Sequence, residues 1–456
     1  MASDGSADID PNSLLTRLVR RITMGLNSPE LSLAKSLGFQ GYIDYHLNPV
    51  MIDDSAMDLR LASFTTLGMT YPQMVTFNNS GLVENELIEA TILRARYSRR
   101  QLLERMVEFW TDHFSINIAS LQQAKAIHDR DIVRVHALGS FPTLLTLTAQ
   151  SPAMLIYLGN FDSVAGNPNE NFARELLELH TMGVGGGYTQ FDVEEIARCF
   201  TGWTFYPDNA GPLAGSFRYS AQFHDQGTKH VLGHVIPPGG GLADGFTVLN
   251  ILSAHPSTAS FIARKICTWL LGEQTPMGVI ESVKAAYLSS NGDIRSMIRV
   301  ALRPEHLADA LPRFKRPFHL FISAMRALSC SITSVGALRT QLRMNGHYPF
   351  YWPAPDGYPD EASYWNGLML PRWNFGALLT NGNITGASVD HQAFFLGAAS
   401  AEAMADRIDQ MMFGGEMPIA ERNLIRNALL PEGIGSSARQ RDALGLAVSA
   451  PSFQWY

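Results

Sequence analysis

The chain has few of the features that would assign it to a specialised structural class. It contains only three cysteines, which are far apart and form no CxxC pair. This spacing argues against a disulfide framework or a zinc knuckle, and we expect small buried side chains instead. No apolar run approaches the length of a membrane span, and the net charge of −7 provides no basic surface for nucleic acid. We therefore expect neither a membrane span nor a nucleic-acid partner.

Several sequence motifs are also absent. The glycine run at residues 183–188 follows a helical pattern rather than a strand, so it is neither a dinucleotide fingerprint nor a P-loop. There is no G-x-S-x-G, HExxH or EF-hand spacing. The first residues, MASDGSADIDPNS, lack the basic head and apolar stretch of a signal peptide. As written the chain reads as cytoplasmic, unless an export signal precedes it, and the compartment stays open.

Helical periodicity dominates what is present, and it predicts a mostly α fold: a multi-helical orthogonal bundle with a small β-hairpin insert. We expect a disordered N-terminus (1–12), a helical core (13–206), a Gly/Pro-rich insert (207–245) and a helical C-terminal part (246–456) packed on the same core. Within the insert, alternating residues 217–223 and a return strand at 230–236 predict one hairpin that turns at 225–227.

The most informative segment is residues 167–203, NPNENFARELLELHTMGVGGGYTQFDVEEIARCFTGW. We expect Asn167 to cap a helix, with Pro168 in its first turn and Glu170 completing a capping box. A second box, Thr189 with Asp192, predicts the next helix. Helical spacing places a polar stripe on one face of the first helix, opposite an apolar face. The stripe consists of Asn171, Arg174, Glu175 and Glu178.

Paired carboxylates on one helical face can perform general acid/base chemistry, because a neighbouring cation keeps one of them ionised. Glu175 and Glu178, with Arg174, are the predicted catalytic residues. Glu108 and Asp112 form a second stripe of this kind. The alternative for either stripe is a solvated helix face, whose ion pairs contribute little.

An aromatic stretch with several prolines follows at residues 348–373. Exposed rings beside carboxylates suit stacking on sugar rings, whereas buried rings would only hold a loop on the core. The predicted substrate-binding residues are Asn171, Trp352, Trp365, Arg372 and His224. We expect no cofactor. A divalent metal is the alternative, with His113, His128 and Asp129 as its ligands, although no metal-binding motif is present.

The chain resembles the bacterial domain-of-unknown-function 1800 family over nearly its whole length. The resemblance rests on the run NENFARELLELHTMGV and on segments on either side of it, namely YTQFDV, TGW, FWTDHFSIN, HDRDIVRVHALGSF, HPSTASFIARKI, KRPFHLFISAMRAL, PAPDGYP and SAPSFQ. Thr111 stands where the family often has histidine. The resemblance implies no reaction. Relatives often carry export signals and are encoded beside sulfatase-like proteins, which makes such a protein a candidate partner.

Three functions follow from these features. The first is a carboxylate-dependent hydrolase or lyase that acts on a glycan-like substrate, polymeric or small, by general acid/base catalysis. The second is a metal-dependent enzyme that uses a His/Asp/Glu site. The third is a non-enzymatic helical scaffold or partner-binding protein, in which the charged helix faces fix the packing.

Overall fold

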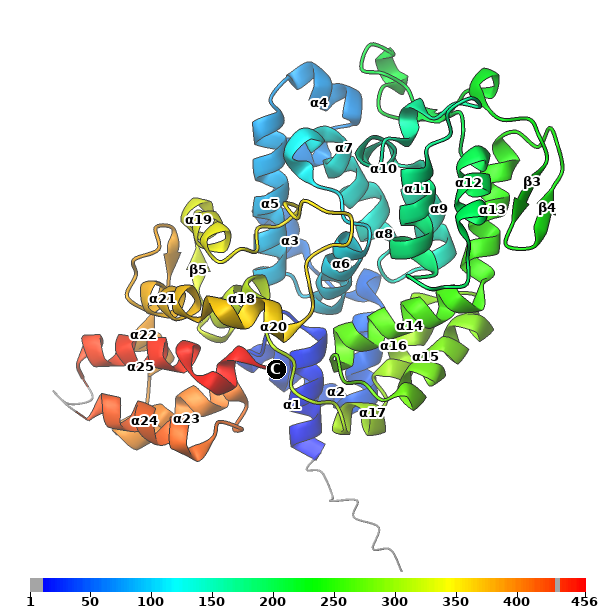
Figure 1. The fold of residues 1–456 in the computed structure, drawn as a ribbon. Coiled ribbons are helices and arrows are strands. Elements are labelled where there is room, and N and C mark those ends of the chain that lie inside the picture. Colours follow the sequence, from blue (N-terminus) through cyan, green and yellow to red (C-terminus); the bar gives the residue numbers. More distant parts are fainter. Residues whose placement is uncertain (1–10, 431–434) are drawn as a thin grey trace, which may run out of the picture.

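The computed structural model describes residues 11–430 and 435–456 of the chain and shows a mostly helical protein with small two-stranded antiparallel sheets (Figure 1). This confirms the predicted fold class. The predicted disordered segment 1–12 falls almost entirely on residues 1–10, which lie outside the described residues, and the first helix begins at Pro11. None of the described helices combines the length and the hydropathy that a membrane crossing requires.

The helices of the first half of the chain are α1 (Pro11–Ile22), α2 (Ser28–Leu47), α3 (Ser55–Leu61), α4 (Tyr71–Phe77), α5 (Ser80–Tyr97), α6 (Gln101–His113), α7 (Gln122–Ile127), α8 (Arg134–His136), α9 (Phe141–Gln150), α10 (Pro152–Tyr157), α11 (Glu170–Glu175) and α12 (Gln190–Cys199). Those of the second half are α13 (Leu242–Ala254), α14 (Pro256–Leu271), α15 (Met277–Ser290), α16 (Ile294–Ala301), α17 (Pro304–Ala308), α18 (Pro317–Ala327), α19 (Gly336–Met344), α20 (Ala362–Trp365), α21 (Met369–Thr380), α22 (His391–Phe394), α23 (Ala401–Ile408), α24 (Ile419–Leu429) and α25 (Ser437–Ser449).

The helix pattern follows from apolar residues spaced three and four apart. In α6, Leu102, Met106 and Phe109 are buried on one face. The opposite face carries Glu104 and Glu108, which the fold also shields from water. Because both faces of α6 are covered, this helix runs through the interior, and its carboxylates need partners from other segments.

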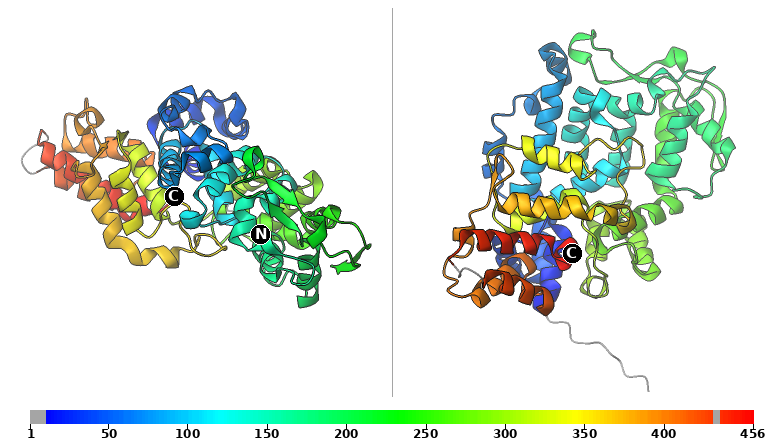
Figure 2. Two further views of the ribbon diagram at one scale, coloured as in Figure 1. Left: turned by 90° about the horizontal axis from the view of Figure 1, so that it is seen from above. Right: turned by 60° about the vertical axis from the view of Figure 1, so that its left-hand side comes forward.

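The buried apolar side chains form two large clusters. The first gathers side chains of α1, α2, α6 and α9 to α17. The second gathers α5 with α18, α19 and α21 to α25, so a helix from the first hundred residues is part of the core of the C-terminal region. Figures 1 and 2 show the segment between α19 and α20, drawn in yellow, lying against the cyan helices of the first half. The backbone hydrogen bond from Ile118 N to Phe350 O, 2.9 Å, ties these parts together.

Three helical segments widen into π-turns: η4 (His128–Val133), η6 (Leu176–Thr181) and η10 (Asp409–Phe413). In η6, which continues α11, the Thr181 hydroxyl donates to Leu176 O, 2.6 Å, and Met182 N donates to Leu177 O, 2.8 Å. Single π-turns inside helices are frequent at functional sites. Two of the three lie in segments on which the family resemblance rests.

The strands are β1 (Trp203–Phe205), β2 (Phe217–Tyr219), β3 (Lys229–Val231), β4 (His234–Ile236), β5 (Ser331–Ile332) and β6 (Ala387–Ser388). They pair as β1 with β2, β3 with β4 and β5 with β6. The predicted pairing of 217–223 with 230–236 is therefore wrong. The return segment folds on itself instead, because Leu232 and Gly233 both adopt positive φ, at 49° and 81°, and so make a tight two-residue turn.

Candidate functional site

The N-cap of α11, the helix within the run NENFARELLELHTMGV, differs from the prediction. Asn169, not Asn167, is the N-cap of α11, and its side chain accepts a hydrogen bond from Phe172 N. The helix begins at Glu170, so Pro168 lies before the cap and Glu170 does not complete the predicted capping box. The second prediction is confirmed, because Thr189 and Asp192 form a reciprocal capping box at the start of α12.

The polar stripe of α11 and η6 lies at the surface. The Arg174 side chain is 39% exposed, and it reaches Glu170 at 3.6 Å and Glu178 at 3.9 Å. Pairs of this length at this exposure are screened by water and contribute little to stability. Asn171 is exposed, and its amide donates to Leu158 O at 3.3 Å. These contacts match the solvated-face alternative for Arg174.

Glu175 has a different environment from the rest of the stripe. Partial burial raises the pKa of its carboxyl, and the negative charges of Glu178 and Asp356 raise it further, against the opposing charge of Arg174. Asp356 belongs to the loop between α19 and α20. Burial raises the pKa of the Tyr157 hydroxyl to about 12, and the negative charges of Asp356 and Glu175 contribute to this shift. The stripe therefore faces the aromatic loop, which approaches from the far end of the chain.

The aromatic loop is fixed by one hydrogen bond from α10 and by another within the loop. The Tyr157 hydroxyl donates to Pro353 O, 2.9 Å, and the indole N–H of Trp352 donates to Asp356, 2.6 Å. Gly357 lies so close to α6 that a Cβ there would come within 2.2 Å of Asp112 O. The loop thus runs from the polar stripe of α11 and η6 directly onto the end of α6.

The predicted aromatic residues of this stretch divide into two kinds. Trp352 is half-buried and packs on Tyr358 and Tyr364, with centroid distances of 5.0 and 6.0 Å. Tyr364 is 50% exposed, so it can contact a ligand. Trp365 is completely buried and its indole N–H donates to Pro359 O, 2.9 Å, which matches the alternative of a ring that holds the loop.

Two predicted substrate-binding residues lie inside other parts of the molecule. Arg372 is fully buried in α21, where it donates to Gln454 and to Lys315 O. His224 is buried in a network with Asp244 and Lys229, in which Asp244 lies 3.0 Å from the imidazole and 2.6 Å from the ammonium group. The structure does not bring either residue to the polar stripe of α11 and η6.

The predicted metal ligands are buried, and each has a protein partner. His113 Nε2 donates to His180 O, 3.1 Å, His128 Nδ1 lies 3.0 Å from the Ser151 hydroxyl, and Asp129 pairs with Arg134 at 3.2 Å. Burial lowers the pKa of both histidines well below the usual value. Over the described ranges, 11–430 and 435–456, no group of three or more His, Cys, Asp or Glu side chains is placed to hold a metal ion.

The second carboxylate stripe, on α6, forms a buried network. Arg316, from the KRPFHL segment, donates to Glu108 and to Asp112, both at 2.6 Å. Arg105 donates to the other side of Glu108, 3.1 Å, and Arg313 pairs with Asp360. The three guanidinium groups of Arg105, Arg313 and Arg316 lie 4.3 to 4.7 Å from the Trp269 ring. Three guanidiniums are therefore matched by three carboxylates around one indole.

The two carboxyls on α6 are held unequally, because Glu108 contacts two guanidiniums and Asp112 contacts one. Burial raises the pKa of Asp112 to about 6, and the charges of Glu108 and Asp360 assist it against the opposing effect of Arg316. The Asp112 side chain is 20% exposed. A carboxyl of this kind exchanges its proton near neutral pH and remains accessible from outside.

A cavity of about 40 Å³ lies beside this pair, which is room for about two or three water molecules. The Thr111 hydroxyl faces this interior and has no hydrogen-bond partner among the described residues. Thr111 is the position at which the chain departs from the family pattern. The lining residues are Met24, Thr91, Ala95, Glu104, Val107, Glu108, Thr111, Asp112, Arg134, Phe318, His347, Pro349, Phe350 and Tyr358.

Lys265, from the HPSTASFIARKI segment, connects the two carboxylate groups. Burial lowers the pKa of its ammonium group, while Asp360, Asp112 and Asp356 oppose that change. Its charge also lowers the pKa of His113 and His180, after burial. Asp356, Asp360, Lys265 and Arg316 were not among the predicted site residues. Three of the four lie within segments that carry the family resemblance, and Asp360 directly follows PAPDGYP. The resemblance was therefore the signal in the sequence that could have identified these residues.

Neither the search of curated proteins nor the search of solved structures found a match. The model of one protein family does match, and it spans residues 17–455. The segments that carry the charged residues described above, from α6 to the aromatic loop, all fall within this range. On this match, which covers nearly the whole chain, the protein belongs to the family described as "Protein of unknown function (DUF1800)".

Proposed function

We propose that the protein is a carboxylate-dependent hydrolase or lyase that acts on a glycan-like substrate by general acid/base catalysis, with Asp112 as the proton-exchanging group. The observation that carries the proposal is the unequal pair on α6. Asp112 is partly exposed and has a pKa raised to about 6, next to Glu108, which two arginines hold. Carboxyl pairs whose environments differ in this way supply an acid and a base from one residue type.

The chemistry assigns one task to each part of the site. The protonated Asp112 carboxyl donates its proton to the leaving oxygen as the bond to the sugar carbon breaks. A carboxylate on the other side of that carbon then acts as base or nucleophile. Glu175 is the candidate for this second role, because it lies across the Asp356 loop from α6 and burial with neighbouring charge raises its pKa. Glu178 and Arg174 would set its electrostatic environment.

The aromatic loop supports the choice of substrate class. Trp352 lies on the same loop as Asp356 and packs on Tyr358, which lines the cavity beside Asp112, and on the exposed Tyr364 ring of α20. Aromatic faces present a flat apolar surface with polar edges, which suits a sugar ring. A polymer lying along the loop would place its glycosidic bond near the carboxyl groups.

The test is turnover of a panel of aryl glycosides and polysaccharides by the wild type and three variants. Asp112→Asn and Glu175→Gln should each lower kcat by about 10²-fold or more, which is the usual size of an acid/base contribution. Asp131→Asn is the matched control, because Asp131 is 49% exposed and, within the described part of the chain, pairs with its neighbour Arg130 at the surface. Its activity should equal that of the wild type. Unchanged turnover in both site variants would reject the proposal.

The charge balance around Trp269 favours a second candidate function, a non-enzymatic scaffold or partner-binding protein. Three buried guanidiniums and three carboxylates neutralise one another there, as in networks that only fix packing. In that case Asp112→Asn would lower the thermal midpoint of unfolding, and no member of the panel would be turned over by the wild type. A sulfatase-like protein encoded beside relatives is the first partner to test for binding.

A further inference from the structure

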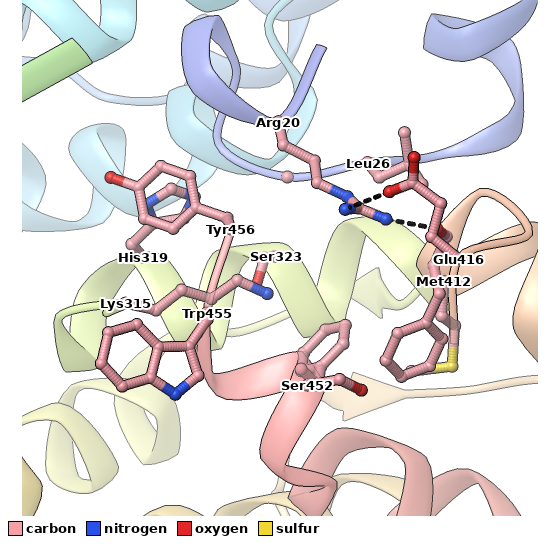
Figure 3. A pocket seen from close by; sticks show the side chains of 13 residues that line it. Arg20, Leu26, Lys315, His319, Ser323, Met412, Glu416, Ser452, Trp455 and Tyr456 are labelled. Carbon is pink, nitrogen blue, oxygen red and sulfur yellow. Dashed lines mark hydrogen bonds and ion pairs between the residues drawn. The ribbon is translucent and has the colours of Figure 1, made fainter. Parts of the chain in front are cut away.

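A separate pocket lies where the C-terminal segment packs against α1 and α18 (Figure 3). Its volume is about 60 Å³, and it adjoins a groove of about 880 Å³ that shares five of its lining residues. The shared residues are Arg20, Glu416, Ser452, Trp455 and Tyr456. The pocket has no lining residue in common with the cavity beside Asp112.

Lys315 is one of only six lysines in the chain, and its amine projects into this pocket (Figure 3). The backbone fixes it from both sides, because its N–H donates to Gln454 O, 2.8 Å, and its carbonyl accepts from Arg372, 2.6 Å. The residue is 6% exposed. The amine lies over the Phe453 ring, 3.7 Å from the centroid, and among the described residues it has no hydrogen-bond or acidic partner.

A buried ammonium group without a counter-charge is costly, and the surroundings of Lys315 add to the cost. Burial lowers the pKa of its amine well below the usual value, and the positive charges of Arg20 and Arg372 lower it further. The nearest acidic lining residue, Glu416, is already engaged by Arg20 and by Ser13, both at 2.7 Å. Because its pKa is lowered, this amine has a larger uncharged, nucleophilic fraction at a given pH than an exposed lysine has.

We propose that Lys315 is a nucleophilic amine that forms a Schiff base with a small aliphatic aldehyde or ketone, which enters from the groove. The apolar part of the pocket, Leu26, Met412 and Phe453, would hold a short alkyl chain and would exclude water from the carbon under attack. The groove has room for a larger substituent on the carbonyl compound. This site and its chemistry are independent of the function proposed for Asp112.

The step is balanced without any oxidant or cofactor. The Lys315 amine attacks the carbonyl carbon, a C–N bond forms, and the electron pair of the C=O bond moves to oxygen, which takes up a proton. The amine nitrogen then loses a proton, the hydroxyl takes up a second proton and leaves as water, and the nitrogen lone pair forms the C=N bond of a protonated imine. Ser323 and His319 line the same pocket, and His319 Nε2 has no hydrogen-bond partner among the described residues. These two side chains are placed to relay the protons.

The experiment treats the whole protein with propanal and sodium cyanoborohydride, which reduces the imine and fixes it, and measures the modification of each lysine by peptide mass spectrometry. Lys315 should be modified at least 10-fold faster than the exposed Lys35, and its rate should stop rising with pH well below the ordinary lysine pKa of about 10.4. Lys125 is the matched buried control, because its amine also lacks a hydrogen-bond partner but lines neither the pocket nor the groove. It should stay unmodified.

Two variants decide between reactivity and access. Lys315→Met should remove the fast modification from the intact-mass profile and leave the slower lysines unchanged. Ser452→Phe, at the junction of pocket and groove, should slow modification of Lys315 by at least 10-fold while the lysine itself is intact. Circular dichroism melting verifies that both variants fold. Modification of Lys315 no faster than that of Lys35 would overturn the proposal, and an unchanged rate in the folded Ser452→Phe variant would overturn entry from the groove.

Discussion

The strongest prediction for stability concerns Glu30, which joins α2 to α18. Its carboxylate accepts a hydrogen bond from the Tyr42 hydroxyl, 2.8 Å, and contacts His46 at 3.1 Å and Arg326 at 3.2 Å. The Glu30 side chain is 11% exposed. Burial alone would raise the pKa of this carboxyl, but the hydrogen bond from His46 and the charge of Arg326 lower it from 4.5 to about 2.

The magnitude follows from the two pKa values. Each pH unit between them is worth about 1.4 kcal/mol, so the ionised carboxylate contributes about 3 kcal/mol to the free energy of unfolding. Because the pKa is lower in the folded state, this contribution is complete above about pH 4.5 and disappears as the pH falls through about 2. At pH 3 about 1.4 kcal/mol of it should remain.

The assay is urea unfolding of the wild type and Glu30→Gln at several values between pH 7 and pH 3. The stability difference between the two proteins should fall by about 2 kcal/mol over this range, because only the wild type loses the charged carboxylate. Glu170→Gln is the control, since Glu170 is 48% exposed, and its stability difference should stay below about 1 kcal/mol at every pH. A difference for Glu30→Gln that does not change with pH would show that its carboxylate is not stabilised by charge.

Three further changes test other parts of the fold. Lys229→Met leaves the fully buried Asp244 without its ammonium partner, so the free energy of unfolding should fall by about 3–5 kcal/mol in urea titrations. The control Lys284→Met should lower it by less than about 1 kcal/mol, because its partner Glu281 is 53% exposed. Gly357→Ala places a Cβ 2.2 Å from Asp112 O, at a φ of +78°. This variant should lower both the thermal midpoint of unfolding and any turnover that depends on Asp112. The control Gly367→Ala, whose Cβ would meet no atom within 4 Å, should change neither. Thr189→Ala removes the capping box of α12 and should cost about 1 kcal/mol in the same titrations, and no loss would show that the cap is redundant.

Local rules predicted much of the fold because they act over a few residues. Helical periodicity identified the helical character of the chain, and the capping box at Thr189 was read directly from its spacing. The turn at Leu232 and Gly233 was missed because leucine rarely adopts positive φ, and this pair does not resemble the Asn-Gly sequence typical of such turns. The two short hairpins therefore could not be separated from the sequence alone.

The candidate site was harder to predict, because its residues are distant in sequence. Spacing placed Glu108 and Asp112 on one face of α6, but only the fold shows that Arg316, some two hundred positions later, binds both. The polar stripe of α11 and η6 illustrates another limit of prediction from spacing. Helical spacing assumes 3.6 residues per turn, whereas η6 is a wider π-turn from Leu176 to Thr181, which the spacing of residues in the sequence does not reveal.

The contrast between the two stripes indicates where proton transfer is best supported. Around Arg174 the ion pairs are longer than 3.5 Å and open to water, so they contribute little, while partial burial and the charges of Glu178 and Asp356 raise the pKa of Glu175. Around Arg316 the contacts are 2.6 Å and the guanidinium is almost sealed, yet Asp112 keeps a route to solvent. A pH–rate profile separates the two centres. If Asp112 supplies the proton, activity should fall above about pH 6 as its carboxyl ionises, and Asp112→Asn should abolish that limb, whereas Glu175→Gln should leave it in place.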